Sequence, residues 1–172
     1  MIAEAGLGLL WIAAALAILQ FALGWIAVAR ERDEQLASVR AISVAQGILV
    51  SLSFFALILL FLRSDMSVSL VAANSHSAKP WLYKFAGTWG NHEGSMLLWV
   101  TILGVAGSAV ALFERSLKPS TLIATLAAQA ALSIGFYVFL LFSSNPFTRL
   151  TPAAAEGQGL NPLLQDPGLA FH

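Results

Sequence analysis

Residues 5–29 read AGLGLLWIAAALAILQFALGWIAVA and contain no charged side chain. About 20 apolar residues, each rising roughly 1.5 Å along a helix, suffice to cross the hydrocarbon core of a bilayer. Three further uncharged runs have similar length, at residues 41–62, 94–113 and 120–143. Their apolar residues are continuous rather than alternating, which is typical of helices and not of barrel strands. The sequence therefore predicts an all-α membrane protein with four transmembrane helices.

The overall composition also indicates a membrane protein. Of the 172 residues, 58% are hydrophobic and only 10% are charged, whereas a soluble domain carries roughly 25% charged residues. So little charge cannot cover a water-facing surface, and much of the exterior must face lipid. The formal net charge is zero, which gives no basic surface for nucleic acid. The absence of cysteine excludes disulfides, thiolate metal sites and thiol catalysis within these residues.

The basic residues between the runs predict the orientation. The two short connections hold five of them: Arg30, Arg32, Arg40, Arg115 and Lys118. The opposite side holds four, spread over far more residues: Arg63, Lys79, Lys84 and Arg149. Lys and Arg near helix ends favour the cytoplasm. We therefore expect the N-terminus, residues 63–93 and the C-terminal segment to lie outside, in the periplasm.

The last part of the chain, residues 145–172, differs from the four-helix region at residues 1–144. It is rich in proline and glycine and lacks an apolar span. Because the residue before a proline is pushed out of the helical region, we expect an irregular external segment with at most a short surface helix at residues 163–164. Apolar residues lead directly to His172, so the chain is expected to be truncated there.

Three histidines lie on the predicted external side: His76, His92 and His172. No two share helical spacing and no carboxylate joins them in a zinc pattern, so spacing alone does not favour a zinc site. Histidine is also the usual axial ligand of haem iron.

His92 and Glu93 directly precede the third apolar run, and two interpretations remain open for them. Asn91 can cap a helix that begins there, with Glu93 favourably placed in its first turn. Alternatively, His92 and Glu93 form a polar cluster that faces a cavity at the membrane edge.

Aromatic residues surround this segment: Trp81, Tyr83, Trp89 and Trp99. Amphipathic rings of this kind form belts at the level of the lipid headgroups. The alternative is a surface for a flat aromatic ligand such as a porphyrin, with offset ring stacking. Lys79 or Lys84 would then pair with its carboxylates.

Few polar residues interrupt the four runs: Gln20, Gln46, Ser51, Ser53, Gln129 and Ser133. We expect them to form hydrogen bonds between helices. The predicted spans contain no ionisable side chain, which argues against a proton or ion path through these helices alone. The sequence also lacks a phosphate-binding loop, a Ser-His-Asp arrangement and an acidic pair, so a self-contained hydrolase is not expected.

Three stretches resemble one known family. They are WGNHEGSMLLW at residues 89–99, SNPF at residues 144–147 and EGQGLNPLLQDPGLAFH at residues 156–172. In this order and spacing they resemble the N-terminal region of CcmF, the large membrane subunit of bacterial cytochrome c maturation. The resemblance covers essentially the whole chain.

The resemblance implies a haem lyase component of the bacterial inner membrane. Such proteins receive b-type haem from the periplasmic chaperone CcmE and help to attach it to apocytochrome c, together with CcmH and CcmI. It implies that His172 is an external axial ligand of the haem iron. Histidines for a membrane-embedded haem b come later in the family, so this piece is expected to be inactive alone. Three further candidates for the haem site or an interface are His92, Glu93 and Trp89.

Two alternatives remain. The paralogous lyase component dedicated to cytochrome c nitrite reductase shares these motifs. A different class is a membrane transporter or scaffold subunit, which would not contact haem.

Overall fold

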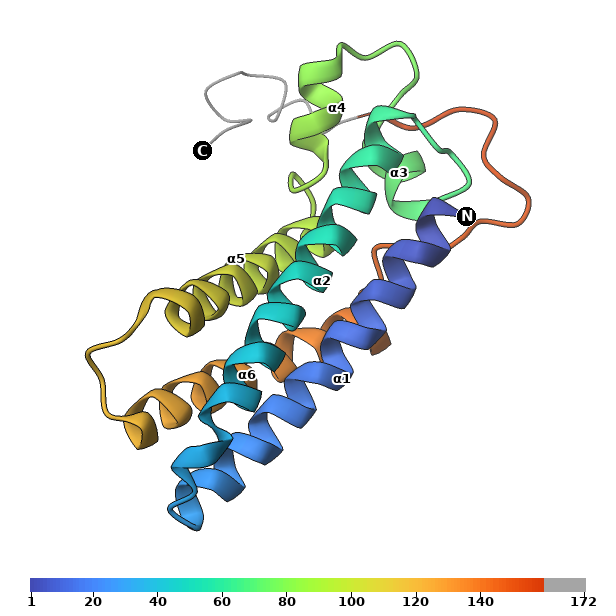
Figure 1. Cartoon of the computed structure of the whole chain (residues 1–172). Coiled ribbons are helices and arrows are strands. Elements are labelled where there is room, and N and C mark those ends of the chain that lie inside the picture. Colours follow the sequence, from blue (N-terminus) through green and yellow to red (C-terminus); the bar gives the residue numbers. More distant parts are fainter. Residues whose placement is uncertain (160–172) are drawn as a thin grey trace.

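The computed structural model describes residues 1–159, and in this part the chain is helical (Figure 1). The elements are α1 (Ile2–Ala29), the short 3-10 helix η1 (Asp33–Gln35), α2 (Leu36–Leu62), α3 (Ser69–Asn74), α4 (Trp81–Gly87), α5 (His92–Phe113) and α6 (Pro119–Phe142). Four of these helices are long and apolar enough to cross a membrane: α1, α2, α5 and α6. The predicted all-α fold with four transmembrane helices is confirmed.

The four long helices form a bundle in which each runs antiparallel to the next along the chain. α1 packs against α2 and α6, and α2 also packs against α5. α5 and α6 contact each other less extensively than these pairs. The bundle is therefore most closely packed around α1 and α2.

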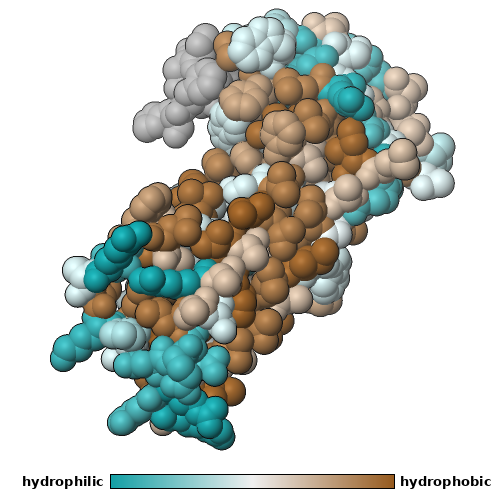
Figure 2. Space-filling model, viewed as in Figure 1, coloured by the Kyte–Doolittle hydropathy of each residue, from teal (hydrophilic) through white to brown (hydrophobic). Residues whose placement is uncertain are grey.

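The exterior of the bundle is apolar. Trp25 is 66% exposed and Phe142 is 73% exposed, and Figure 2 shows a broad hydrophobic surface along the helices. Hydrophilic residues gather at the end formed by residues 30–35 and 114–118, which we call the hairpin end. A contiguous apolar surface of this extent is not compatible with water. The chain is a multi-pass membrane protein.

The helices extend beyond the predicted spans at their beginnings. α1 begins at Ile2 rather than residue 5, and α2 begins at Leu36 rather than residue 41. The additional turns bring Glu4 and Arg40 into helices, each close to a helix end. Arg40 Nη2 donates a hydrogen bond of 2.6 Å to the Glu114 carbonyl oxygen, so at the hairpin end it ties α2 to the loop after α5.

Most of the polar residues inside the bundle link neighbouring helices, as predicted. Gln20 Nε2 donates to the Leu126 carbonyl oxygen at 2.8 Å and to Gln129 Oε1 at 3.2 Å. Gln129 Nε2 in turn donates to the Leu103 carbonyl oxygen on α5 at 3.2 Å. Ser53 donates to the Gly6 carbonyl oxygen on α1 at 2.8 Å.

The prediction was wrong for two serines. Ser51 donates to the carbonyl oxygen of Gly47, one turn earlier in α2. Ser133 donates to the carbonyl oxygen of Gln129 in its own helix. A serine side chain is short, so it reaches a neighbouring helix only where the two backbones lie close, and otherwise it bonds back to its own helix.

The opposite end of the bundle, which we call the capped end, carries two segments. Residues 63–91 contain α3 and α4, which the sequence analysis did not predict. Residues 145–159, which we call the strap, run from the end of α6 back across α1 and α3. Phe147 in the strap is buried, and its ring occupies the space that a side chain at Gly6 would fill. The strap is thereby packed into the same apolar core as the helices.

Candidate functional site

The turn before α5 is rigidly built. Asn91 is the N-cap of α5, and its Oδ1 accepts a hydrogen bond of 2.7 Å from the Gly94 backbone N–H. Its Nδ2 donates to the Gly87 carbonyl oxygen at 2.8 Å. Any Cβ at Gly94 would overlap the Thr88 carbonyl oxygen, so only glycine allows this close approach. The predicted cap is confirmed, and it fixes His92 as the first residue of the helix.

His92 lies at the edge of an apolar cleft between α5 and α6. The cleft has a volume of about 410 Å³ and is also lined by Met96, Leu132, Gly135, Phe136 and Phe139. We call it the His92 cleft. A Cβ built on Gly135 meets nothing within 4 Å, so the wall is open at that position. Leu132 is 63% exposed on the outer surface of α6, which places one side of the cleft toward lipid.

The imidazole of His92 is held by two contacts. Nδ1 lies 3.2 Å from the Ser144 hydroxyl oxygen. The ring packs edge-to-face on Phe139, with 5.3 Å between centroids. When Nδ1–H donates to Ser144, Nε2 keeps its lone pair, and such a second partner commonly orients a metal-binding histidine. In the other tautomer, Nε2–H is a hydrogen-bond donor. The group can therefore bind iron or a polar ligand atom.

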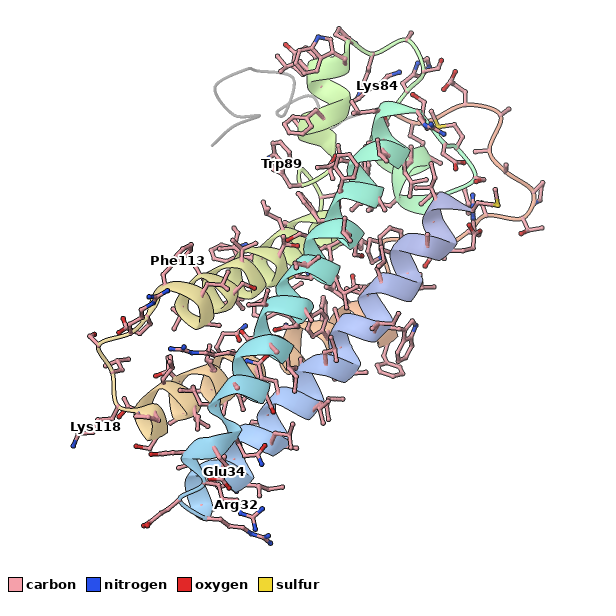
Figure 3. All side chains as sticks on the ribbon, in the orientation of Figure 1. Arg32, Glu34, Lys84, Trp89, Phe113 and Lys118 are labelled. Carbon is pink, nitrogen blue, oxygen red and sulfur yellow. The ribbon has the colours of Figure 1, made fainter. Side chains whose placement is uncertain are left out.

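The neighbours of His92 in the sequence are placed differently. Trp89 packs edge-to-face on Phe85 of α4, with 4.8 Å between ring centroids, and Figure 3 shows it where α4 meets α5. Among the described residues, the lining of the His92 cleft includes neither Trp89 nor Glu93. Of these three candidates, His92 is the one that lines the cleft in the described part of the chain.

The aromatic residues and lysines of the capped end differ in their exposure and contacts. Trp81 is 70% exposed on α4, and Trp99 is 57% exposed on the second turn of α5. Lys84 Nζ donates to the Ser77 carbonyl oxygen at 2.8 Å. Lys79 Nζ is buried without a hydrogen-bond partner among the described residues, and burial lowers the pKa of Lys79.

An ion-pair cluster that the sequence analysis did not anticipate centres on Arg149 of the strap. Arg149 Nε donates to Glu4 Oε1 at 2.9 Å and Nη2 donates to Glu4 Oε2 at 3.0 Å. Nη1 reaches Asp65 Oδ2 at 3.5 Å and also donates to the Ser67 hydroxyl. A hydrogen bond from Ser67, supported by the Arg149 charge, lowers the pKa of Asp65. We call these four residues the Arg149 clasp.

Backbone hydrogen bonds continue the contact on either side of the clasp. Ser69 N–H donates to the Thr148 carbonyl oxygen at 2.9 Å, and Leu150 N–H donates to the Ser67 carbonyl oxygen at 2.8 Å. The strap thus pairs briefly with the turn before α3, where Val68 and Arg149 form an isolated antiparallel bridge.

The far end of the strap is held against α3. The Glu156 carboxylate accepts hydrogen bonds from the Ser77 hydroxyl at 2.5 Å and the Ser77 backbone N–H at 3.1 Å. These bonds, with one from the Gly157 N–H, lower the pKa of Glu156 to about 2. Gly159 N–H donates to the Ser75 carbonyl oxygen at 3.1 Å. His172, the predicted axial ligand, lies outside the described residues.

The described residues contain no group of three or more His, Cys, Asp or Glu side chains that could hold a metal ion. Of the histidines in this part of the chain, His76 lies in the loop before α4 and His92 begins α5. Both are at the capped end, so residues 1–159 provide no histidine pair within the membrane interior for a resident haem.

Similarity to known proteins extends over the whole chain. The family described as cytochrome C assembly protein matches residues 89–172, which include His92 and the strap. CycK of Bradyrhizobium diazoefficiens, a cytochrome c-type biogenesis protein, is 50% identical over 100% of this chain. CcmF of Escherichia coli is 41% identical, also over 100% of this chain. The chain belongs to the CcmF family. It spans about a quarter of the length of these relatives, at 26% and 27%.

Two further comparisons refine this placement in the CcmF family. NrfE of Haemophilus influenzae, also a cytochrome c-type biogenesis protein, is 46% identical over 65% of this chain and 18% of its own length. A solved structure titled cytochrome c heme lyase CcmF superimposes with a TM-score of 0.80 at 23% identity. It covers 86% of this chain and 25% of that chain. At this identity the superposition supports the fold of the CcmF family.

Proposed function

We propose that this chain is the N-terminal part of a membrane haem lyase that acts in cytochrome c maturation. The full protein receives b-type haem from the chaperone CcmE and helps to attach it to apocytochrome c, with CcmH and CcmI as further partners. The observation that carries the proposal is the 50% identity to a cytochrome c-type biogenesis protein over the entire chain. A four-helix membrane bundle with a capped end suits a protein that handles its cargo at the membrane surface.

We further propose that the capped end faces the periplasm and that the protein lies in the bacterial inner membrane. The hairpin end carries Arg30, Arg32, Arg115 and Lys118 in short loops, and basic residues near helix ends favour the cytoplasmic side. The capped end then presents the strap and the His92 cleft on the side where c-type cytochromes are assembled.

His172 supplies one axial ligand to the incoming haem in this proposal. His92 is a second candidate contact, because the His92 cleft combines apolar walls with one imidazole at its edge, and an apolar macrocycle with a polar edge suits such a site. Trp89 and Glu93 lie outside the lining of the cleft, and we assign them to an interface with a partner. The axial ligands of any resident membrane haem b must come from outside residues 1–159.

The proposal is tested with the full-length protein, co-produced with haem-loaded CcmE. We expect His172→Ala to abolish haem capture in the visible spectrum and to reduce the yield of c-type cytochrome. His76→Ala is the control, since His76 Nδ1 accepts a local hydrogen bond from the Ala78 N–H and lies away from the cleft lining. Unchanged haem capture and unchanged yield in His172→Ala would refute the proposal.

A second candidate is the paralogous lyase component for cytochrome c nitrite reductase, favoured by the 46% identity to NrfE. The two candidate functions are distinguished by expressing the full-length protein in a strain that lacks both lyases. Restoration of ordinary c-type cytochromes supports the first candidate, and restoration of nitrite reductase alone supports the second.

A further inference from the structure

Besides the His92 cleft, an apolar groove runs between α2 and α5. It has a volume of about 410 Å³, and its walls include Ile48, Leu52 and Phe55 of α2 and Val105 of α5. Each of these four residues is between 46% and 55% exposed, so the groove opens at the outer surface of the bundle, which faces lipid. We call it the α2–α5 groove.

The floor of the α2–α5 groove is a close contact between the two helices. A Cβ at Gly47 would overlap Ser108 Oγ and the Gly104 carbonyl oxygen. The Ser108 hydroxyl donates to that carbonyl oxygen at 2.9 Å. The Ser51 hydroxyl donates to the Gly47 carbonyl oxygen at 2.7 Å. The side chains that line the groove therefore offer an occupant hydrocarbon contacts rather than hydrogen-bond donors, which suits an acyl chain.

Arg40 lies on the groove face of α2, toward the hairpin end. With 3.6 residues per turn, its direction from the helix axis is within about 20° of those of Gly47 and Ser51, and it lies about 10 Å along the axis from Gly47. Arg40 Nη2 donates to the Glu114 carbonyl oxygen at 2.6 Å, just beyond the end of α5. The guanidinium therefore lies between the two helices that form the groove.

The positive charge of Arg40 is not neutralised within the described part of the chain. None of the ion pairs that residues 1–159 form includes Arg40. The Glu114 carboxylate instead accepts hydrogen bonds from the backbone N–H and the hydroxyl of Ser116, both at 2.6 Å. Arg40 Nε is buried without a hydrogen-bond partner in the same residues. An unpaired guanidinium at the membrane edge is costly, and an anion at the end of the groove would offset that cost.

We propose that the α2–α5 groove and Arg40 together bind one anionic phospholipid. An acyl chain lies along the apolar walls, and the lipid phosphate accepts hydrogen bonds from the Arg40 guanidinium. Basic pockets between transmembrane helices bind anionic headgroups in this way, and the planar fork of arginine matches two phosphate oxygens. Arg115 in the adjacent loop adds positive charge, which favours an anionic lipid over a zwitterionic one. This site does not depend on the haem function proposed above.

The site is tested by lipid retention in the full-length protein. The purified protein is incubated with mixed micelles that contain equal amounts of dioleoyl phosphatidylglycerol and dioleoyl phosphatidylcholine, and the retained lipid is counted by native mass spectrometry. We expect Arg40→Gln to lower retention of phosphatidylglycerol about fivefold, the usual effect of one basic residue on an anionic headgroup. Arg40→Lys should lie between the two, because it keeps the charge and loses the fork. Arg63→Gln is the control, since it makes the same charge change at the other end of α2.

A second variant tests the groove without altering Arg40. Val105→Trp should fill the groove and lower retention of phosphatidylglycerol by a similar factor. Val138→Trp is its control, because Val138 on α6 is also 51% exposed and lies outside the lining of the groove. Val105→Trp leaves the bond from Arg40 to Glu114 in place, so it decides the question if Arg40→Gln does not fold.

Three results would overturn the proposal. The first is equal retention of phosphatidylglycerol by the parent protein and Val105→Trp. The second is an equal loss in Arg40→Gln and Arg63→Gln, because the lipid would then respond to net charge alone. The third is a lower thermal stability of Val105→Trp with unchanged lipid retention, which would mean that another helix of the full-length protein occupies the groove.

Discussion

Gln46 on α2 donates a hydrogen bond of 2.9 Å to the hydroxyl of Tyr137 on α6, across the interior of the bundle. Both side chains are buried, with 0% and 1% exposure. α2 and α6 are not among the most extensively packed pairs of helices, so this bond connects two elements whose other contacts are few.

Tyr137→Phe removes the hydroxyl and leaves Gln46 Nε2 without this acceptor in an apolar interior. We expect the free energy of unfolding to fall by about 1 kcal/mol, the usual range for hydrogen bonds between membrane helices. The measurement is reversible unfolding in detergent micelles. In a double-mutant cycle with Gln46→Leu, a coupling energy near zero would show that the bond contributes nothing.

The cap of α5 gives a second prediction. Asn91→Ala deletes the acceptor for the Gly94 N–H and the donor to Gly87, and we expect a loss of about 1 kcal/mol. Asn91→Asp is the matched control, since it keeps an oxygen at the Oδ1 position. Thermal unfolding should rank the wild type and Asn91→Asp above Asn91→Ala, and equal stability of all three would contradict the cap.

The His92 cleft is tested by filling it. At Gly135 nothing lies within 4 Å of an added Cβ, so Gly135→Leu should place its side chain in the cleft while the bundle keeps its stability. If the cleft receives haem, capture from CcmE should fall severalfold. Gly8→Leu is the control, because Gly8 has equally open surroundings on α1. Equal haem capture by the two variants would remove the cleft from the haem site.

The strap should respond to pH through Glu156. Hydrogen bonds from Ser77 and Gly157 lower the pKa of Glu156 from 4.5 to about 2. A group with a depressed pKa stabilises the docked state above its ordinary pKa, and this stabilisation is lost as the pH falls through the depressed value. The docked end of the strap should therefore persist from pH 7 to pH 4.

Ser77→Ala removes the main cause of that shift, so the pKa of Glu156 should return toward 4.5. Ser75 is buried at 1% exposure, so maleimide labelling of a Ser75→Cys full-length protein reports release of the strap. Between pH 7 and pH 4 labelling should be higher in Ser77→Ala than in the parent protein and nearly independent of pH, whereas labelling of the parent should rise as the pH falls from about 4 toward 2. Identical pH profiles for the two proteins would show that Glu156 does not hold the strap.

The sequence predicted those features that depend on local composition. The four spans follow from uncharged runs longer than the bilayer requires, and the cap at Asn91 follows from residue types at fixed offsets. Ser51 departed from the expectation because its choice of partner depends on how closely two backbones approach, which a sequence does not state.

The structure of the capped end and the contacts of the candidate site were harder to predict from the sequence. α3 and α4 contain six and seven residues, which is too short for a helical period to be recognised. The contact between Arg149 and Glu4 joins positions 145 residues apart, and no local pattern marks it. His92 was noted from its neighbours in the sequence, yet its contacts with Ser144 and Phe139 arise only from the packing of α5 beside α6.

The bond between Arg149 and Glu4 also has a consequence for biosynthesis. Glu4 is translated near the start of these residues, and its partner is made only after all four helices have been synthesised. The two residues can meet only when the chain between them crosses the bilayer an even number of times, since an odd number of crossings would leave them on opposite sides. The ion pair therefore forms only after all four helices have been made, and it cannot form when a single helix has failed to cross.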